Sequence, residues 1–250
     1  MRFQALGGAL AASLLVGGMG VASSTTADNA PAYVTAAVAD PSRPAADVAL
    51  DADRKPAAIL TFIGLKPGDK VVDFFGGAYW DRLFSKVVGP TGRVTTFQAT
   101  EMAKALKQTL PVPGSRPYPE YPNIVAQSRS INDLHPGRSD LDMVWMRQNY
   151  HDLYDPFMGP ANVPAVDNTI FTSLKHGGVF VVIDHSAPDG SGLASTNTTH
   201  RIDEAVVKKD LASAGFELVA ESNLYRNPAD TRDKHGSEND DRFILVFRKP

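Results

Sequence analysis

The sequence predicts an α/β protein with a doubly wound, mostly parallel sheet of seven strands. Three observations predict it. Short apolar runs alternate along the chain with amphipathic helical patterns, which is typical of a parallel sheet covered by helices on both faces. The last helical pattern is followed by two apolar runs, so a final pair of strands completes the sheet. With 250 residues, of which 43% are hydrophobic, the chain can bury one sizeable core, and we expect one domain.

The first 27 residues have the pattern of a secretory signal peptide. Arg2 and the amino terminus supply positive charge, Ala5 to Ala22 carries no charge, and small residues lead up to Ala27. A membrane anchor is the alternative, since the uncharged run is about long enough to span a bilayer. Its glycines favour a cleaved signal, so we expect a periplasmic or secreted protein.

After the signal, residues 28–44 are rich in alanine and proline and predict a flexible segment, and residues 45–250 predict the folded domain. A short helix around Ala45 to Lys55 leads into that domain. The predicted strands are, in order, Lys70–Asp73, Arg93–Phe97, Ile124–Ala126, Asp142–Met146, Val179–Asp184, Phe216–Glu221 and Phe243–Arg248.

Three helical patterns lie between these strands. Between the first two strands, apolar residues from Trp80 to Val88 recur at helical spacing and end at Gly89. A second helix ends near Leu174, directly before the most apolar strand, which we expect to be central and buried. The third is an amphipathic helix predicted over Thr199–Ala214.

Charge and cysteine content exclude several classes of function. The formal net charge is −3 at pH 7, so the composition predicts no nucleic-acid partner and favours a small-molecule one. The chain contains no cysteine, which excludes disulfides, thiol catalysis and cysteine-ligated metals.

The turn after the first strand, Asp73-Phe-Phe-Gly-Gly-Ala-Tyr-Trp80, predicts a ligand cradle. Ligands of doubly wound sheets bind beyond the carboxyl ends of the strands, near the point where the strand order reverses. Gly76 and Gly77 would let a ligand approach the backbone, and helix amides beginning near Tyr79 could face a carboxylate. The alternative is that the two glycines only connect the strand to the helix.

The segment "LKPGDKVVDFFGGAYWDRLFSKVVGPTGRV" resembles the opening segment of class I S-adenosylmethionine-dependent methyltransferases. "VWMRQNYHDLYDP", "LKHGGVFVVIDHSA" and "HRIDEAVVKKDLASAGF" resemble later segments of one branch, the predicted methyltransferases with an N-terminal export signal. The resemblance covers about Ala45 to Pro250. It implies an antiparallel last strand and S-adenosylmethionine as the cofactor. The residues that it implies at the cofactor are Asp73, Gly76, Gly77, Tyr79 and Gln98.

Two residues differ from the usual pattern of that family. Phe75 stands at the place of the first glycine of the turn, and Gln98 stands where the family carries an acidic residue that binds the ribose hydroxyls. Glutamine has one acceptor oxygen and no charge, so it would hold a diol less firmly, and Glu101 is the alternative acid. A second hypothesis is therefore an exported binding or accessory protein that keeps the fold without methyl transfer.

Polar and aromatic residues follow the fourth strand, in the segment that faces the transferred methyl group in methyltransferases. Asn149 and Tyr150 would hold the methyl acceptor, and His151 or Asp152 would remove a proton from it. The alternative is that the tyrosines of this segment pack the loop while His151 and Asp152 cap the next helix.

A set of histidines and aspartates follows strands or opens helices on the same side of the predicted sheet. The set comprises His151, Asp152, Asp184, His185 and His200. Such a set can bind zinc or another divalent ion, which makes a metal-dependent enzyme a third hypothesis. The HxxxH and HxH spacings of strong metal motifs are absent, so we expect hydrogen-bonding roles, a wider spacing of the donor atoms, and no metal.

Overall fold

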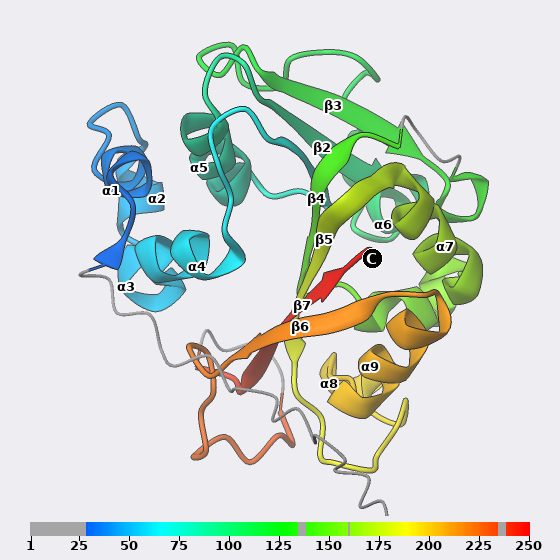
Figure 1. Cartoon of the computed structure of the whole chain (residues 1–250). Coiled ribbons are helices and arrows are strands. Elements are labelled where there is room, and N and C mark those ends of the chain that lie inside the picture. Colours follow the sequence, from blue (N-terminus) through cyan, green and yellow to red (C-terminus); the bar gives the residue numbers. More distant parts are fainter. Residues whose placement is uncertain (1–28, 135–138, 160, 235–238) are drawn as a thin grey trace, which may run out of the picture.

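The structure is a computed structural model that describes residues 29–134, 139–159, 161–234 and 239–250. It contains a seven-stranded sheet with the order β3-β2-β1-β4-β5-β7-β6 (Figure 1). β7 pairs antiparallel with both β5 and β6, and the other pairs are parallel, which confirms the predicted fold class. The strands are β1 (Lys70–Phe74), β2 (Arg93–Ala99), β3 (Ile124–Arg129), β4 (Leu141–Arg147), β5 (Leu174–His185), β6 (Glu217–Ser222) and β7 (Arg242–Arg248).

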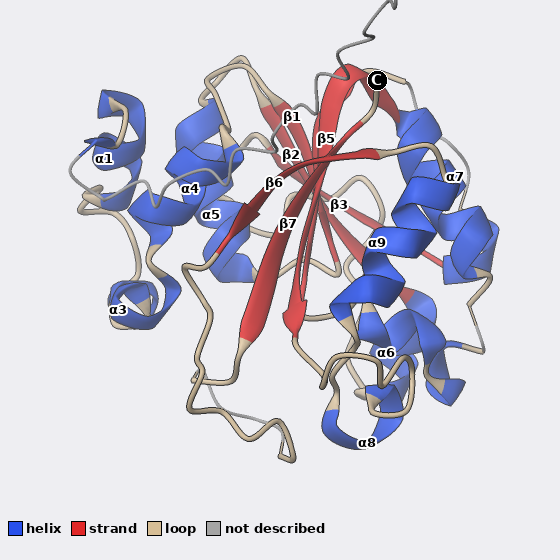
Figure 2. Ribbon diagram, turned by 60° about the horizontal axis from the view of Figure 1, so that its bottom comes forward, coloured by secondary structure: helices blue, strands red, loops and turns tan. Residues whose placement is uncertain are grey.

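Helices lie on both sides of the sheet, so the molecule has three layers (Figure 2). One side carries α1 (Ala32–Val38), α2 (Ala45–Val48), α3 (Asp51–Arg54), α4 (Pro56–Ile63) and α5 (Ala78–Val88). The other side carries α6 (Thr100–Ala105), α7 (Val163–Ser173), α8 (Thr196–Thr199) and α9 (Glu204–Ser213). Short 3-10 turns are η2 (Ile131–Asp133), η3 (His151–Tyr154) and η4 (Pro156–Met158).

Alternating side chains of the central strands fill two separate cores, because successive residues of a strand point to opposite faces. Val144 and Val182 belong to the core under α7 and α9, whereas Trp145 and Val181 belong to the core under α5. The Trp145 ring lies 5.0 Å from the ring of Trp80 on α5. This packing fixes α5, and with it the turn that precedes the helix, against the carboxyl ends of β1 and β4.

The prediction that residues 28–44 are flexible is wrong for the described part of that segment. α1 lies within it and buries Val34 and Ala37 in the same core as α4 and α5. The following residues are also held in place, because the buried Arg43 pairs with Asp51 at 2.6 Å. The alanine- and proline-rich composition of the segment did not reveal the short apolar stripe of α1. The folded unit therefore begins before residue 45. The predicted signal peptide, residues 1–27, lies outside the described residues.

Two predicted helices are interrupted in the structure. The helix expected over Ala45–Lys55 is divided into α2 and α3. The helix expected from Thr199 begins at Glu204, because His200 has a left-handed φ of 50° and Asp203 accepts a hydrogen bond from Ala205 N as the new N-cap. Among the described residues, we find no helix with both the length and the apolar character that crossing a membrane requires.

Candidate functional site

A cavity of about 380 Å³ lies where the strand order reverses, beyond the carboxyl ends of β1 and β4. This is the position at which doubly wound sheets bind ligands, and the volume is within the range of small-molecule sites. The lining comes from three segments, namely α3, the turn and helix after β1, and the end of β4. It consists of Arg54, Asp73, Phe75, Gly77, Ala78, Tyr79, Trp80, Trp145, Arg147, Gln148 and Asn149.

The two glycines of the turn have different roles. A Cβ on Gly76 would overlap the hydroxyl of Thr96, so Gly76 lets the turn pack against β2, and it does not line the cavity. Gly77 has an extended backbone, with φ −129° and ψ 130°, and a Cβ there would meet no atom within 4 Å. Of the two, only Gly77 faces open space in the cavity, where any side chain would take the place of a ligand.

Asp73 and Asp81 form a buried pair of carboxyl groups beside the cavity. Burial and the negative charge of Asp81 raise the pKa of Asp73 well above its usual range. Burial also raises the pKa of Asp81 to about 7, although Thr96 and Asp73 oppose the shift. The pair therefore keeps a proton at neutral pH, and a cation in the cavity would favour its release. Gly77 N donates a hydrogen bond to Asp73 Oδ2 over 3.3 Å, which orients the carboxyl group.

Two of the predicted cofactor residues are already engaged with the protein. The Tyr79 ring lines the cavity, but its hydroxyl donates to Asp51 Oδ1 over 2.7 Å. Gln98 lies outside the cavity lining, and its Nε2 donates to the Gly76 carbonyl over 2.8 Å. The alternative acid is engaged too, because Glu101 accepts hydrogen bonds from Ser130 Oγ at 2.5 Å and Ile131 N at 3.0 Å. Gln98 and Gly76 thus stabilise the turn, contrary to the predicted cofactor contacts.

The cavity has a cationic part that was not predicted from the sequence. Arg147 ends β4, and Arg54 comes from α3, with its guanidinium 4.6 Å from the centre of the Tyr79 ring. The position of Arg147 after an apolar strand was the only sequence signal for its role. Arg54 had none, because the packing of the N-terminal helices brings it to the cavity.

The predicted acceptor residues are divided between the cavity, the core and a polar cluster. Asn149 lines the cavity. Tyr150 is fully buried, and its hydroxyl donates to Asp167 Oδ2 over 2.9 Å, so the predicted acceptor role of Tyr150 is wrong. Its ring fills the core under α7, as the packing alternative predicted. His151 and Asp152, one of which was expected to remove a proton from the acceptor, both lie outside the cavity lining.

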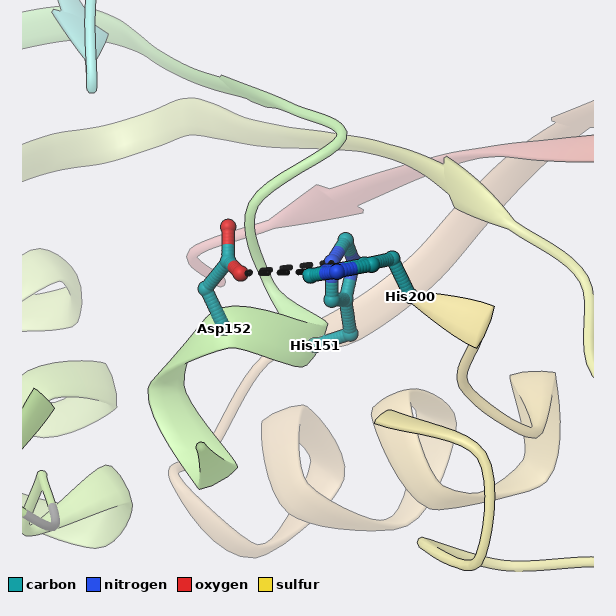
Figure 3. A group of neighbouring side chains, drawn as sticks. All are labelled: His151, Asp152 and His200. Carbon is teal, nitrogen blue, oxygen red and sulfur yellow. Dashed lines mark hydrogen bonds and ion pairs between the residues drawn. The ribbon is translucent and has the colours of Figure 1, made fainter. Parts of the chain in front are cut away.

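His151, Asp152 and His200 form a polar cluster at the same edge of the sheet (Figure 3). His151 Nε2 lies 3.3 Å from Asp152 Oδ1 and 3.3 Å from His200 Nδ1, and the Asp152 and His200 atoms are 3.9 Å apart. Asp184 accepts from His151 Nδ1 over 2.8 Å at the back of the cluster. The prediction that these side chains gather on one side of the sheet is confirmed, but the expected wide spacing of the donor atoms is wrong for these three residues.

The two buried histidines have opposite protonation. Burial lowers the pKa of His151, but the charge of Asp184 and the contact with Asp152 outweigh burial and raise it to about 10. Burial lowers the pKa of His185 to about 3. His185 belongs to a neighbouring set of contacts, with its Nε2 2.7 Å from Gln148 Nε2 and its Nδ1 3.3 Å from Asp240 Oδ2.

Three residues at this edge adopt left-handed backbone conformations that side chains usually avoid. Their φ angles are 69° for Phe75, 61° for Gln148 and 50° for His200. Such conformations cost on the order of 1 to 3 kcal/mol each and are concentrated at functional sites. Each belongs to the lining of the cavity or to the polar cluster, which supports this edge as the functional one.

A larger cavity, of about 740 Å³, lies between the sheet and α7. Its lining includes Lys70, Arg93 and Arg129, and none of the predicted site residues belongs to it. No residue of the turn Phe75–Gly77 lines it, so we do not assign it to the candidate site.

Comparison with solved structures shows what the fold resembles. A methyltransferase from Aquifex aeolicus, described as dependent on S-adenosylmethionine, matches with a TM-score of 0.53 over 83% of this chain and 94% of its own, at 16% identity. The fold is that of class I methyltransferases. A candidate sarcosine dimethylglycine methyltransferase from Galdieria sulphuraria matches with a TM-score of 0.52 over 82% of this chain and 87% of its own, at 13% identity.

The same fold also occurs in a protein named for a different reaction. The [4+2]-cyclase SpnF matches with a TM-score of 0.52 over 80% of this chain and 81% of its own, at 15% identity. No family model matches the sequence, and no curated protein matches it. At these identities the likeness shows the fold alone, so the function must be argued from the site.

Proposed function

We propose that the chain binds S-adenosylmethionine in the 380 Å³ cavity and transfers its methyl group to a small molecule. One observation supports the proposal above all. Where the strand order reverses, the backbone of Gly77 is open to a ligand, and the buried acids Asp73 and Asp81 lie beside it. S-adenosylmethionine carries an ammonium and a sulfonium group, and when bound it supplies an electrophilic methyl group.

The cavity contains groups that fit both ends of the amino-acid part of the cofactor. Asp73 would hold the ammonium group, and Arg54 or Arg147 would hold the carboxylate. Asn149 lines the cavity beside them and would orient the acceptor, which needs little more than alignment with the methyl group. The Asn149 amide is held in place from outside the cavity, since its Nδ2 donates to Asp152 Oδ2 over 2.8 Å.

A binding or accessory protein is the second candidate, and the ribose end of the cavity favours it. Gln98 has an amide in place of a carboxylate, and its Nε2 donates to the Gly76 carbonyl of the turn. The Glu101 carboxylate accepts from Ile131 N of η2, so neither residue presents a free carboxylate to a pair of hydroxyls. A chain with this fold and these contacts would bind a small molecule without methyl transfer.

Calorimetric titration with S-adenosylmethionine and S-adenosylhomocysteine tests the proposal. We expect micromolar affinity that strengthens between about pH 6 and pH 8, because a cationic ligand favours the deprotonated form of a pair whose pKa values are raised in the free protein. Binding should release a proton, which is measured from the dependence of the binding enthalpy on the ionisation enthalpy of the buffer. In Asp81→Asn, which removes one carboxyl group of the pair, this release should decrease.

The absence of binding at millimolar concentrations of either ligand would contradict the proposed cofactor and favour the second candidate. Binding that is independent of pH in the wild type would contradict the role of the acidic pair. A methylated product from candidate acceptors, detected by mass spectrometry, distinguishes methyl transfer from binding alone.

We also propose that the protein acts outside the cytoplasm, on the basis of the signal pattern in residues 1–27. Mass spectrometry of the protein isolated from its source should find a mature chain that lacks Met1 to about Ala27. An intact amino terminus in the membrane fraction would show that the segment is an anchor.

A further inference from the structure

The polar cluster has the spacing of a metal site. Three distances describe it, 3.3 Å from His151 Nε2 to Asp152 Oδ1, 3.3 Å from His151 Nε2 to His200 Nδ1, and 3.9 Å between the last two atoms. A point equidistant from all three atoms lies about 2.0 Å from each, which is the length of zinc bonds to imidazole nitrogen and carboxylate oxygen. With bonds of about 2.0 Å and tetrahedral angles, two ligand atoms of a zinc ion are about 3.3 Å apart.

Hydrogen bonding alone accounts less well for this geometry. Asp184 accepts hydrogen bonds from two backbone amides, those of His151 and His185, and its Oδ1 lies 2.8 Å from His151 Nδ1, so the proton on Nδ1 is committed to this carboxyl group. His151 Nε2 then faces a carboxylate oxygen and a second imidazole at equal distances, and both distances exceed the usual 2.7 to 3.2 Å of an N–H hydrogen bond. One N–H cannot point at both atoms, whereas one cation between the three atoms would be bound by all of them.

The residues behind the cluster orient its donor atoms. Asp184 also accepts from the backbone amide of His151 over 2.9 Å, so it fixes both the ring and the turn. Asn149 Nδ2 donates to Asp152 Oδ2 over 2.8 Å, which leaves Oδ1 facing the centre. In metal sites a carboxylate usually accepts from the remote nitrogen of a histidine ligand, and the remote oxygen of a carboxylate ligand usually accepts a hydrogen bond.

The cluster is open on one side. Asp152 and His151 are buried, but the side chain of His200 is 38% exposed and comes from the end of α8, across from η3 (Figure 3). Two histidines and one carboxylate with an open position form the ligand set of catalytic zinc sites and of non-haem iron(II) sites. Asn149 contacts Asp152 and also lines the proposed cofactor cavity, so a bound ion would lie next to the acceptor.

We propose that His151, Asp152 and His200 bind a divalent transition-metal ion, with Zn²⁺ as the ion tested first. The proposal is independent of S-adenosylmethionine binding, because none of these three side chains lines the cofactor cavity.

The test uses the full purified chain, stripped of metal and then titrated with Zn²⁺ and with Co²⁺. We expect one equivalent of zinc and, for Co²⁺, the visible absorption bands of a four- or five-coordinate ion bound to nitrogen and oxygen. His200→Asn is the first variant, because asparagine tolerates the left-handed backbone of residue 200. Loss of a residue that only orients a ligand lowers metal affinity by roughly ten- to hundredfold. The zinc affinity of His200→Asn should decrease by at least as much, since a direct ligand is removed. Asp152→Asn should have the same effect.

His176→Ala is the matched control, because His176 is exposed and its ring contacts Pro250 O at the opposite end of β5. This variant should bind zinc as the wild type does. Thermal unfolding of the metal-free variants establishes that they fold, and added zinc should raise the melting temperature of the wild type and of His176→Ala only. Failure of the wild type to bind zinc or cobalt, or equal affinity in the wild type and in His200→Asn, would overturn the proposal.

Discussion

We expect Gly77→Val to abolish the binding of S-adenosylmethionine while the protein still folds. The backbone of Gly77 is extended, which valine adopts readily, and the position of the added Cβ is free of other atoms. The side chain would therefore occupy the cavity that the ligand needs. A loss of more than about 3 kcal/mol of binding free energy, or over a hundredfold in affinity, is expected by calorimetry. The free energy of unfolding should decrease by about 1 kcal/mol, which is the typical cost of replacing a favoured N-cap residue such as glycine with a disfavoured one such as valine.

Gly76→Ala is the comparison variant for this prediction. Its Cβ would overlap the Thr96 hydroxyl, so it should destabilise the protein by about 1 to 3 kcal/mol, as overpacking does. The two neighbouring glycines thus separate folding from binding. Unchanged affinity in Gly77→Val would mean that the ligand binds elsewhere or is not S-adenosylmethionine.

We expect Arg201→Leu to lower the free energy of unfolding by about 3 to 5 kcal/mol, which is the cost of removing one partner from a buried ion pair. Arg201 is fully buried and lies 2.9 Å from Asp230 and 3.3 Å from Asp240. It also donates to the carbonyl groups of Lys234 and Ser186. The substitution would leave these acceptors without their donor and would release the loop between β6 and β7. Chemical denaturation monitored by circular dichroism measures the change.

Arg248→Leu is the control for Arg201→Leu. Arg248 pairs with Glu217 at 2.7 Å, but both side chains are about half exposed, at 49% and 53%. An exposed pair contributes at most about 1 kcal/mol. Equal destabilisation by the two substitutions would contradict the importance of the buried network around Arg201.

The order of strands along the chain and the location of the site could be predicted because they depend on local patterns. The apolar runs that end at Asp73 and Arg147 form β1 and β4, and the turn after Asp73 contains the glycine that its close packing on β2 requires, Gly76. The alternation of strands and helices then leaves few arrangements of a parallel sheet, because crossover connections are right-handed and short. The reversal of strand order therefore occurs beside the predicted turn.

The roles of individual side chains at the site depended on contacts between distant residues, which no local pattern contains. Gln98 on β2 donates a hydrogen bond to the carbonyl group of Gly76 in the turn after β1. The hydroxyl of the buried Tyr150 donates a hydrogen bond to Asp167 on α7. α1 was not predicted for the same reason. Its apolar stripe is too short to be recognised in the sequence, and it is buried only because α4 and α5 pack against it.

The sequence by itself determined that a histidine and an aspartate follow β4 and that another histidine follows β5 at some distance. Only the tertiary structure decided that His200 meets His151 and Asp152 within 4 Å, because α8 ends in a left-handed residue that turns this side chain toward η3. Metal motifs are recognisable in a sequence when their ligands share one helix or one loop. Here the ligands come from separate segments, and the spacing of their donor atoms is set by the packing of α8 on η3.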